Sequence, residues 1–259
     1  MNPRIILVII ALVLPGMGGA APEQKIVDGV TYQVLVVPAD AVRMVWKDAD
    51  GKQLRTIPEV ARDLEAQGVV VDTLMNGGIF EPGGVPSGLL IQDGRQLRPV
   101  NRDAGEGNFF LKPNGIFLIG SKGGAVIGTE EFPLPGVEVR QAVQSGPLLL
   151  RHGKIHPAFN AGSASRLHRN GVGVTKDGRV VLAITDFKSQ KFPNLHGFAE
   201  LFRSLGCDDA LFLDGDISQM HSGADLTKQS NQFGSIIAVI KLAKSDQDAP
   251  ARTTRPLPK

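Results

Sequence analysis

Short apolar segments, interrupted by glycine, proline, asparagine or aspartate, recur along the chain and constrain its fold more than any other feature. The strongest of these segments are residues 69–75, 180–184, 211–213 and 233–242. Such short runs, bounded by turn formers and mostly rich in β-branched residues, are typical of buried strands. Residues 170–184, with a turn at Lys176-Asp177-Gly178, predict a β-hairpin. We therefore expect an α+β (mixed α/β) protein, with a central mixed β-sheet and a few flanking helices.

Two segments carry the signals of helices. Thr56-Ile57-Pro58-Glu59 matches a capping box with proline in the first turn, and Gly68 would end that helix. Asn194 is placed to cap a second helix, which Gly206 would end. The apolar residues of this second segment follow the spacing of one buried helical face: Leu195, Phe198, Leu201, Phe202 and Leu205. We expect both helices to be structural.

The two ends of the chain differ from its middle. Residues 1–20 combine an early positive charge, the apolar run Ile5–Leu14 and small residues before position 20, which is the composition of a signal peptide. That apolar run is too short to span a bilayer. Residues 244–259 are polar and contain several prolines, which predicts a disordered tail. We expect residues 21–243 to form one domain of an exported protein, periplasmic or secreted, with no stable membrane insertion after signal cleavage.

Composition excludes some classes of protein. The net charge of +2 arises from 28 basic and 26 acidic residues that are interspersed along the chain, so we expect no nucleic-acid partner. The single cysteine, Cys207, excludes an internal disulfide, and stability must come from packing. In its apolar context Cys207 is expected to be a buried small residue and not a nucleophile.

Several predicted strands end at polar residues, where binding groups often gather. The segments concerned are Asn76-Gly77-Gly78, Ser145, Asp186, and Asp214-Gly215-Asp216 with Ser218. Taken singly, Asn-Gly and Asp-Gly are more typical of simple turns, and Ser145 before Gly-Pro fits a bend as well as a pocket. If these strand ends share one edge of a sheet, their polar groups meet in one cleft. An antiparallel arrangement could instead place Asp186 at the edge opposite Asn76.

The sequence gives little support for a metal site. The histidines of residues 151–169 lack the spacing of a zinc-binding helix or finger. Residues 214–218 alternate like the start of a calcium loop, but Gln219 stands where an EF-hand requires glycine. We expect no cofactor, and a divalent cation held in another geometry is left open.

In chain order, four groups of residues resemble the motifs of the phosphodiester glycosidase family, which includes the lysosomal uncovering enzyme. The groups are Asn76-Gly77-Gly78-Ile79-Phe80 with Pro86-Ser87-Gly88-Leu89, Ser145-Gly146-Pro147, Arg169-Asn170-Gly171-Val172-Gly173, and Leu213-Asp214-Gly215 with Ser218. The resemblance covers about Asn76–Met220. In one departure, Asp216 and Ile217 replace two glycines of the family's Asp-Gly-Gly-Gly-Ser motif, as in a bacterial exported sub-branch with the Asp-Gly-X-Ile-Ser form. Substrate range therefore does not transfer with the resemblance.

The resemblance implies hydrolysis of the sugar–phosphate bond of a small-molecule or glycan phosphodiester. In such a reaction we expect Asp214 to act at the anomeric carbon, with Asp186 as the second carboxylate. Arg169 is the expected phosphate partner, because a guanidinium binds two phosphate oxygens at once. The further predicted substrate-binding residues are Asn76, Gly77, Gly78, Ser145, Gly215, Asp216, Ser218 and His156.

Two other functions fit the same residues. One is a non-catalytic binding module for sugar-phosphate polymers or envelope glycans, which keeps the cleft without turnover. The other is a purely structural protein in which every motif only forms turns.

Overall fold

The computed structural model describes residues 21–242. The predicted signal peptide, residues 1–20, and the predicted tail, residues 244–259, lie outside the described residues. Within residues 21–242, none of the helices has the length and apolar composition needed to cross a membrane.

The largest sheet has seven strands in the order β1-β2-β15-β14-β16-β12-β13. Its strands are β1 Glu23–Val27, β2 Val30–Val37, β12 Leu148–Arg151, β13 Lys154–Ile155, β14 Asn170–Thr175, β15 Val180–Thr185 and β16 Cys207–Asp214. The predicted hairpin is confirmed, because β14 pairs with β15 from Asn170 opposite Ile184 to Val174 opposite Val180.

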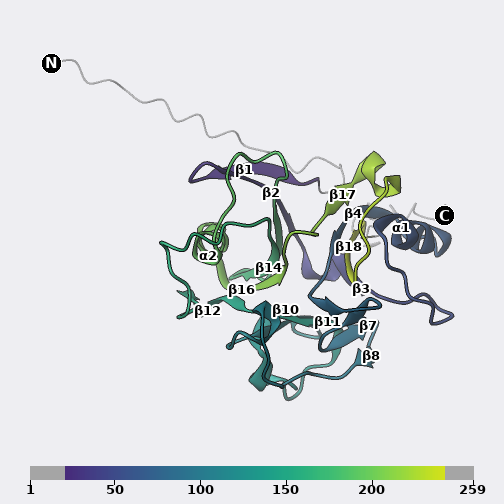
Figure 1. The fold of residues 1–259 in the computed structure, drawn as a ribbon. Coiled ribbons are helices and arrows are strands. Elements are labelled where there is room, and N and C mark those ends of the chain that lie inside the picture. Colours follow the sequence, from purple (N-terminus) through teal and green to yellow (C-terminus); the bar gives the residue numbers. More distant parts are fainter. Residues whose placement is uncertain (1–20, 243–259) are drawn as a thin grey trace, which may run out of the picture.

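Two further sheets complete the frame (Figure 1). The five-stranded sheet contains β7 Leu90–Gln92, β8 Arg95–Arg98, β9 Gly115–Gly120, β10 Gly123–Gly128 and β11 Val139–Ser145. The four-stranded sheet contains β3 Val42–Val45, β4 Val71–Asn76, β17 Met220–Ser222 and β18 Ile236–Ile240. A small hairpin pairs β5 Phe80–Glu81 with β6 Val85–Pro86.

The protein is α+β and mostly β, but the prediction of a central mixed sheet is wrong. Every strand pair in the described part of the chain is antiparallel. The reason lies in the connections: β1–β2 and β7–β8 turn through Asp28-Gly29 and Asp93-Gly94, all four residues having positive φ. Two-residue turns of this kind join antiparallel neighbours, whereas parallel strands need a long crossover.

The two α-helices of residues 21–242 cover outer faces on opposite sides of the molecule (Figure 1). Helix α1, Ile57–Ala66, begins with the predicted capping box and packs Ile57, Val60 and Leu64 against the four-stranded sheet. Helix α2, Leu195–Ser204, is capped by Asn194 as predicted. Its buried residues Phe198, Ala199, Leu201 and Phe202 pack on β16 and its neighbours. Fully burying each of the larger side chains contributes about 1.5–3 kcal/mol.

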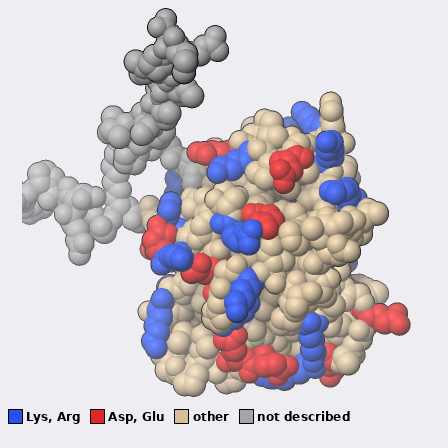
Figure 2. Space-filling view, turned by 90° about the vertical axis from the view of Figure 1, so that its left-hand side faces the viewer, with Lys and Arg blue, Asp and Glu red and all other residues tan. Residues whose placement is uncertain are grey.

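The inner faces of all three sheets share one apolar core. Leu213 of β16, Met75 of β4 and Val143 of β11 belong to the same buried cluster. Strands β4, β11 and β16 end one or two residues after these core residues, at Asn76, Ser145 and Asp214. Packing of the shared core therefore brings the ends of three strands from three sheets together. On the face shown in Figure 2, acidic and basic side chains are interspersed without a large patch of one sign.

Candidate active site

The candidate site lies at one end of the seven-stranded sheet. Strand β14 begins there at Asn170, which is paired with Ile184 of β15 and with Asp214, the last residue of β16. Asp186 follows the end of β15, so the antiparallel pairing places Asp186 and Asp214 at the same end of the sheet. Asn76, from a different sheet, meets them there through Asn170.

Two buried asparagines fix the end of β16. The Asn170 side-chain amide donates to the Asn76 carbonyl oxygen at 2.9 Å and to Asn76 Oδ1 at 3.1 Å. Asn170 Oδ1 accepts the Asp214 backbone N–H at 2.8 Å. Asn76 Oδ1 also accepts the Gln219 N–H at 2.9 Å. The predicted residue Asn76 is therefore part of the site, but its side chain is 1% exposed and bonded within the protein. It positions the strand end that carries Asp214.

Ser145, Gly77 and Gly78 also fix the backbone around the end of β16. Ser145 Oγ donates to the Leu213 carbonyl at 2.8 Å and accepts the Ile79 N–H at 3.3 Å. The Gly77 N–H donates to the Ser235 carbonyl at 2.8 Å. A Cβ at Gly78 would lie 2.9 Å from the Gln144 carbonyl oxygen, so the close approach of the segment after β4 to strand β11 requires glycine. These groups sit around Asp214, with the Ser145 hydroxyl and the Gly77 amide occupied by protein partners.

The turn after β16, residues 214–218, carries two acidic groups and is called the acidic turn below. The Gly215 N–H donates to Asp214 Oδ1 at 2.7 Å, and the Ser218 N–H donates to the Gly215 carbonyl at 2.9 Å. Asp214 is partly buried and Asp216 is exposed. A Cβ added to Gly215 would meet only the His168 carbonyl, at 3.9 Å, which leaves open space beside Asp214.

A hydrogen bond from His168 fixes the end of this turn. Its Nε2 lies 3.0 Å from the Ser218 carbonyl oxygen, and since a carbonyl only accepts, Nε2 carries the hydrogen. Burial lowers the pKa of His168, against the opposing effects of the Ser218 carbonyl and of Asp216 and Asp186. His168 Nδ1 and Ser218 Oγ are both buried without a hydrogen-bond partner among the described residues.

The pKa values of the two candidate carboxyl groups are shifted in opposite directions. Burial raises the pKa of Asp214 to about 6, with a further rise from Asp216, while the Gly215 N–H opposes both. Burial would also raise the pKa of Asp186, but hydrogen bonds from the Lys188 N–H and the Gln33 amide, both at 2.8 Å, outweigh it and lower the pKa. At mildly acidic pH, Asp214 can exchange a proton while Asp186 stays charged.

Arg169 is close in sequence to this end of the sheet but is buried beneath α2. Its Nε donates to the Pro193 carbonyl at 3.2 Å and its Nη2 to the Ser165 carbonyl at 3.3 Å, with Cζ 5.6 Å from the Phe212 ring centroid. Burial lowers the pKa of Arg169 to about 10. Within residues 21–242, it forms no ion pair with a carboxylate. It lines a cavity of about 150 Å³.

His156 does not join the group. Its Nδ1 accepts the Ala158 N–H at 3.1 Å and its ring stacks on Phe159, with ring centroids 4.7 Å apart. It lines a cavity of about 290 Å³ with Arg151 and Leu150. Its hydrogen-bond and ring contacts do not involve Asp214 or the turn that follows it, so the structure gives His156 no part in this constellation.

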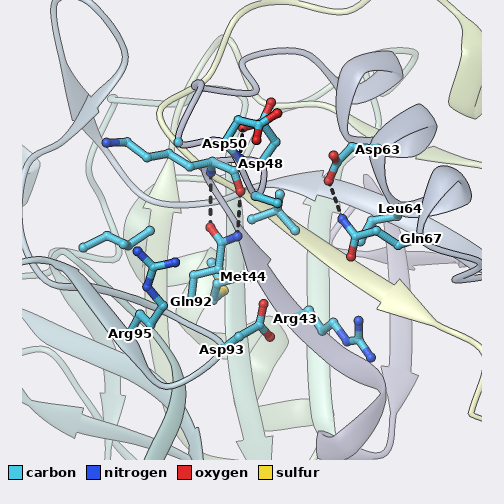
Figure 3. Close-up of a pocket in the computed structure, with 15 residues that line it drawn as sticks. Arg43, Met44, Asp48, Asp50, Asp63, Leu64, Gln67, Gln92, Asp93 and Arg95 are labelled. Carbon is cyan, nitrogen blue, oxygen red and sulfur yellow. Dashed lines mark hydrogen bonds between the residues drawn. The ribbon is translucent and has the colours of Figure 1, made fainter.

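Two larger cavities differ in their relation to the site. A cavity of about 340 Å³ lies between β3, α1 and the β7–β8 turn (Figure 3) and is lined by charges of both signs, including Arg43, Asp63 and Arg95. None of the sequence-predicted residues lines it. A cleft of about 990 Å³ borders α2 and the β1–β2 turn. Its wall includes Phe192, whose ring meets the edge of His168 at a centroid distance of 6.3 Å.

Sequence reasoning missed Asn170, His168 and the aromatic residue that covers His168, Phe187. Asn170 could have been found, because it stands at a strand end as Asp214 does and adjoins the chosen Arg169. His168 is a lone histidine with no local pattern, and its contact with Ser218 spans 50 positions. In residues 21–242, no group of three or more His, Cys, Asp or Glu side chains is arranged to hold a metal ion.

The sequence profile of the phosphodiester glycosidase family matches residues 68–239, which include Asn76, Ser145, Arg169, Asp186 and Asp214. Since the match spans more than half of the chain, the protein belongs to the phosphodiester glycosidase family. Its relatives include the uncharacterized protein YigE of Escherichia coli strain K12, 35% identical over 202 residues that cover 77% of each chain.

Solved structures share the fold. The catalytic domain of zebrafish N-acetylglucosamine-1-phosphodiester α-N-acetylglucosaminidase, auto-inhibited by its pro-peptide, matches with a TM-score of 0.61 and 16% identity, over 86% of this chain and 83% of that one. A candidate exported protein of Burkholderia pseudomallei K96243 matches with a TM-score of 0.51 and 12% identity, over 82% and 74%. A hypothetical protein from Synechocystis matches with a TM-score of 0.50 and 14% identity, over 85% and 61%.

Proposed function

We propose that the protein is an exported hydrolase that releases a sugar from a sugar-1-phosphodiester. One observation carries the proposal: two carboxyl groups with opposite pKa shifts, Asp214 and Asp186, at the same end of one sheet. Enzymes that cleave glycosidic bonds typically use two carboxyl groups held in different environments. Family membership supports the same substrate class, and the signal-peptide composition of residues 1–20 supports export.

The leaving group determines what the protein must supply. When the bond between the anomeric carbon and the bridging oxygen breaks, that oxygen leaves on a phosphate monoester, whose second pKa is about 6. The departing group therefore needs little help from an acid. The new bond to the anomeric carbon comes from water or from a carboxylate, so the main requirement is a base or nucleophile. Asp214 is suited to this role, because above pH 6 it is ionised yet shielded from bulk water.

Arg169 would supply positive charge for the phosphate. Two of its donors are held by the Pro193 and Ser165 carbonyls, and the guanidinium lines the cavity of about 150 Å³. No carboxylate in residues 21–242 forms a direct ion pair with Arg169, although the charge of Asp216 opposes the fall in its pKa, and a buried cation favours an anion nearby. In this proposal Asn76, Asn170 and Ser145 hold the frame, and Asp186 is the second carboxylate, aligned by Gln33.

The test is sugar release from a panel of sugar-1-phosphodiesters by the purified chain and by Asp214→Asn. We expect kcat/KM of the wild type to rise with pH through about 6, and Asp214→Asn to lower it by about 10²–10⁴-fold. Asp225→Asn, on an exposed 3-10 turn, serves as the matched control and should keep wild-type activity. A wild-type chain that binds these compounds but releases no sugar would support the binding module instead, and one that neither binds nor cleaves them would contradict both.

A further inference from the structure

Three exposed apolar residues are associated with the acidic turn, residues 214–218, and with His168, which is bonded to it. Leu167, Phe187 and Ile217 are 42%, 57% and 38% exposed. Phe187 stacks on the His168 ring, and Leu167 and Ile217 are the chain neighbours of His168 and Ser218, the two residues joined by a hydrogen bond. Single exposed apolar residues are ordinary, but a group next to polar groups in an open site marks a binding surface.

Phe187 is held in place from one side. Its ring is nearly parallel to that of His168, with an interplanar angle of 17° and ring centroids 3.8 Å apart. His168 is 5% exposed and is fixed by its bond to the Ser218 carbonyl and by the edge contact with Phe192. One face of Phe187 is therefore covered by a rigid partner while much of the ring remains open to solvent. An aromatic ring fixed in this way binds a ligand without loss of its own rotamer freedom.

Phe187 is close to both segments that carry the candidate carboxyl groups. Phe187 directly follows Asp186, whose oxygens are aligned by Gln33 and by the Lys188 N–H. His168 abuts Gly215, where the missing side chain leaves space beside Asp214. A flat apolar surface bordered by carboxylate acceptors matches a pyranose, which has one face of C–H groups and a rim of hydroxyl donors.

We propose that Phe187 is the stacking platform for the sugar ring at this site, with His168 as the residue that positions it. The C–H face of a pyranose lies on the open face of Phe187, and hydroxyl groups donate to Asp186 and Asp214. This assignment rests on the proposed function, which makes a sugar phosphodiester the substrate. It names Phe187 as the residue that selects a sugar over a non-sugar phosphodiester.

The experiment measures binding of N-acetyl-α-D-glucosamine 1-phosphate and α-D-glucose 1-phosphate to the full chain by calorimetry and saturation-transfer NMR. Leucine at position 187 keeps apolar cover over His168 but removes the aromatic face. We expect Phe187→Leu to weaken binding of at least one probe about tenfold, and Phe187→Tyr and Phe187→Trp to stay close to wild type. Saturation should transfer most strongly to protons of one sugar face. Val36→Ala, an exposed apolar position on β2, is the control and should bind like wild type.

The outcomes separate this assignment from the hydrolase proposal. Equal affinities for wild type and Phe187→Leu overturn the platform, even if Asp214-dependent sugar release is observed. Binding that depends on the aromatic ring, without turnover of any phosphodiester, supports the platform and counts against the hydrolase. Failure of the wild type to bind either probe or any hexose or N-acetylhexosamine overturns the platform. Unchanged melting temperatures of the variants confirm that the differences arise at the site.

Discussion

Replacing Asp214 with asparagine should stabilise the protein at neutral pH. In the folded state burial raises the pKa of this carboxyl from 3.8 to about 6. The folded protein therefore binds the proton more tightly than the unfolded chain does. The stability associated with this group is fully present below pH 3.8, falls as the pH rises toward 6, and is lost above it.

The size of the effect follows from the difference in pKa. The two values differ by about 2 pH units, and each unit corresponds to about 1.4 kcal/mol, so ionised Asp214 costs up to about 3 kcal/mol at pH 7.5. Asparagine keeps an oxygen that can accept the Gly215 N–H and carries no charge. We expect Asp214→Asn to be up to about 3 kcal/mol more stable than wild type at pH 7.5, and nearly equal at pH 4. For a domain of this size, the gain raises Tm by about 6–12 °C.

Urea denaturation at pH 4 and pH 7.5 provides the measurement. Trp46 is the single tryptophan and is 4% exposed, so its fluorescence reports unfolding. Asp225→Asn is the control, because a hydrogen bond from Lys228 lowers the pKa of Asp225 and its removal should give no gain at pH 7.5. If Asp214→Asn is no more stable than wild type at pH 7.5, the carboxylate is not strained by burial, and the argument for a tuned acidic group is refuted.

Three substitutions test the residues around Asp214, and a chemical modification tests the burial of Cys207. Asn170→Ala leaves the partly buried Asp214 N–H without its acceptor and should lower the free energy of unfolding by about 1–3 kcal/mol in urea titrations. Gly78→Ala places a Cβ 2.9 Å from a backbone carbonyl oxygen and should lower Tm, whereas Gly215→Ala, with its nearest atom at 3.9 Å, should leave Tm unchanged. Burial raises the pKa of Cys207 to about 12, so iodoacetamide should modify it only in urea, as mass spectrometry would show.

Local signals in the sequence were enough to predict the parts of the fold that depend on neighbouring residues. The capping box at Thr56, the cap at Asn194 and the hairpin over residues 170–184 each rest on contacts within a few positions, and the structure has all three. The arrangement of the strands was not predictable in this way. The prediction of a mixed sheet is wrong, and strand order was not accessible because it depends on which apolar faces share a core, which no short window of sequence contains.

The same distinction between local signals and long-range contacts applies to the site. Asn76 and Asp214 end strands and Asp186 directly follows one, since a polar residue after a buried run marks a strand end wherever that strand goes. That the three share one cleft stays a prediction. The roles were harder to predict. The bonds of Asn76 to Asn170 and Gln219 turn an expected substrate ligand into a structural group. The sequence holds no positional signal for His156, and its contacts lie elsewhere.

The hydrogen bonds that hold the end of β16 join residues far apart in the chain. Asn170 and Asn76 are separated by 94 positions, Ser145 and Leu213 by 68, and Gln219 and Asn76 by 143. Forming such contacts requires closing long loops, which slows folding and defers these pairings until distant segments have docked. During synthesis, the bond that ties Gln219 to Asn76 can form only after Gln219 has emerged, and a chain cut short before Gln219 would carry Asp214 without that bond.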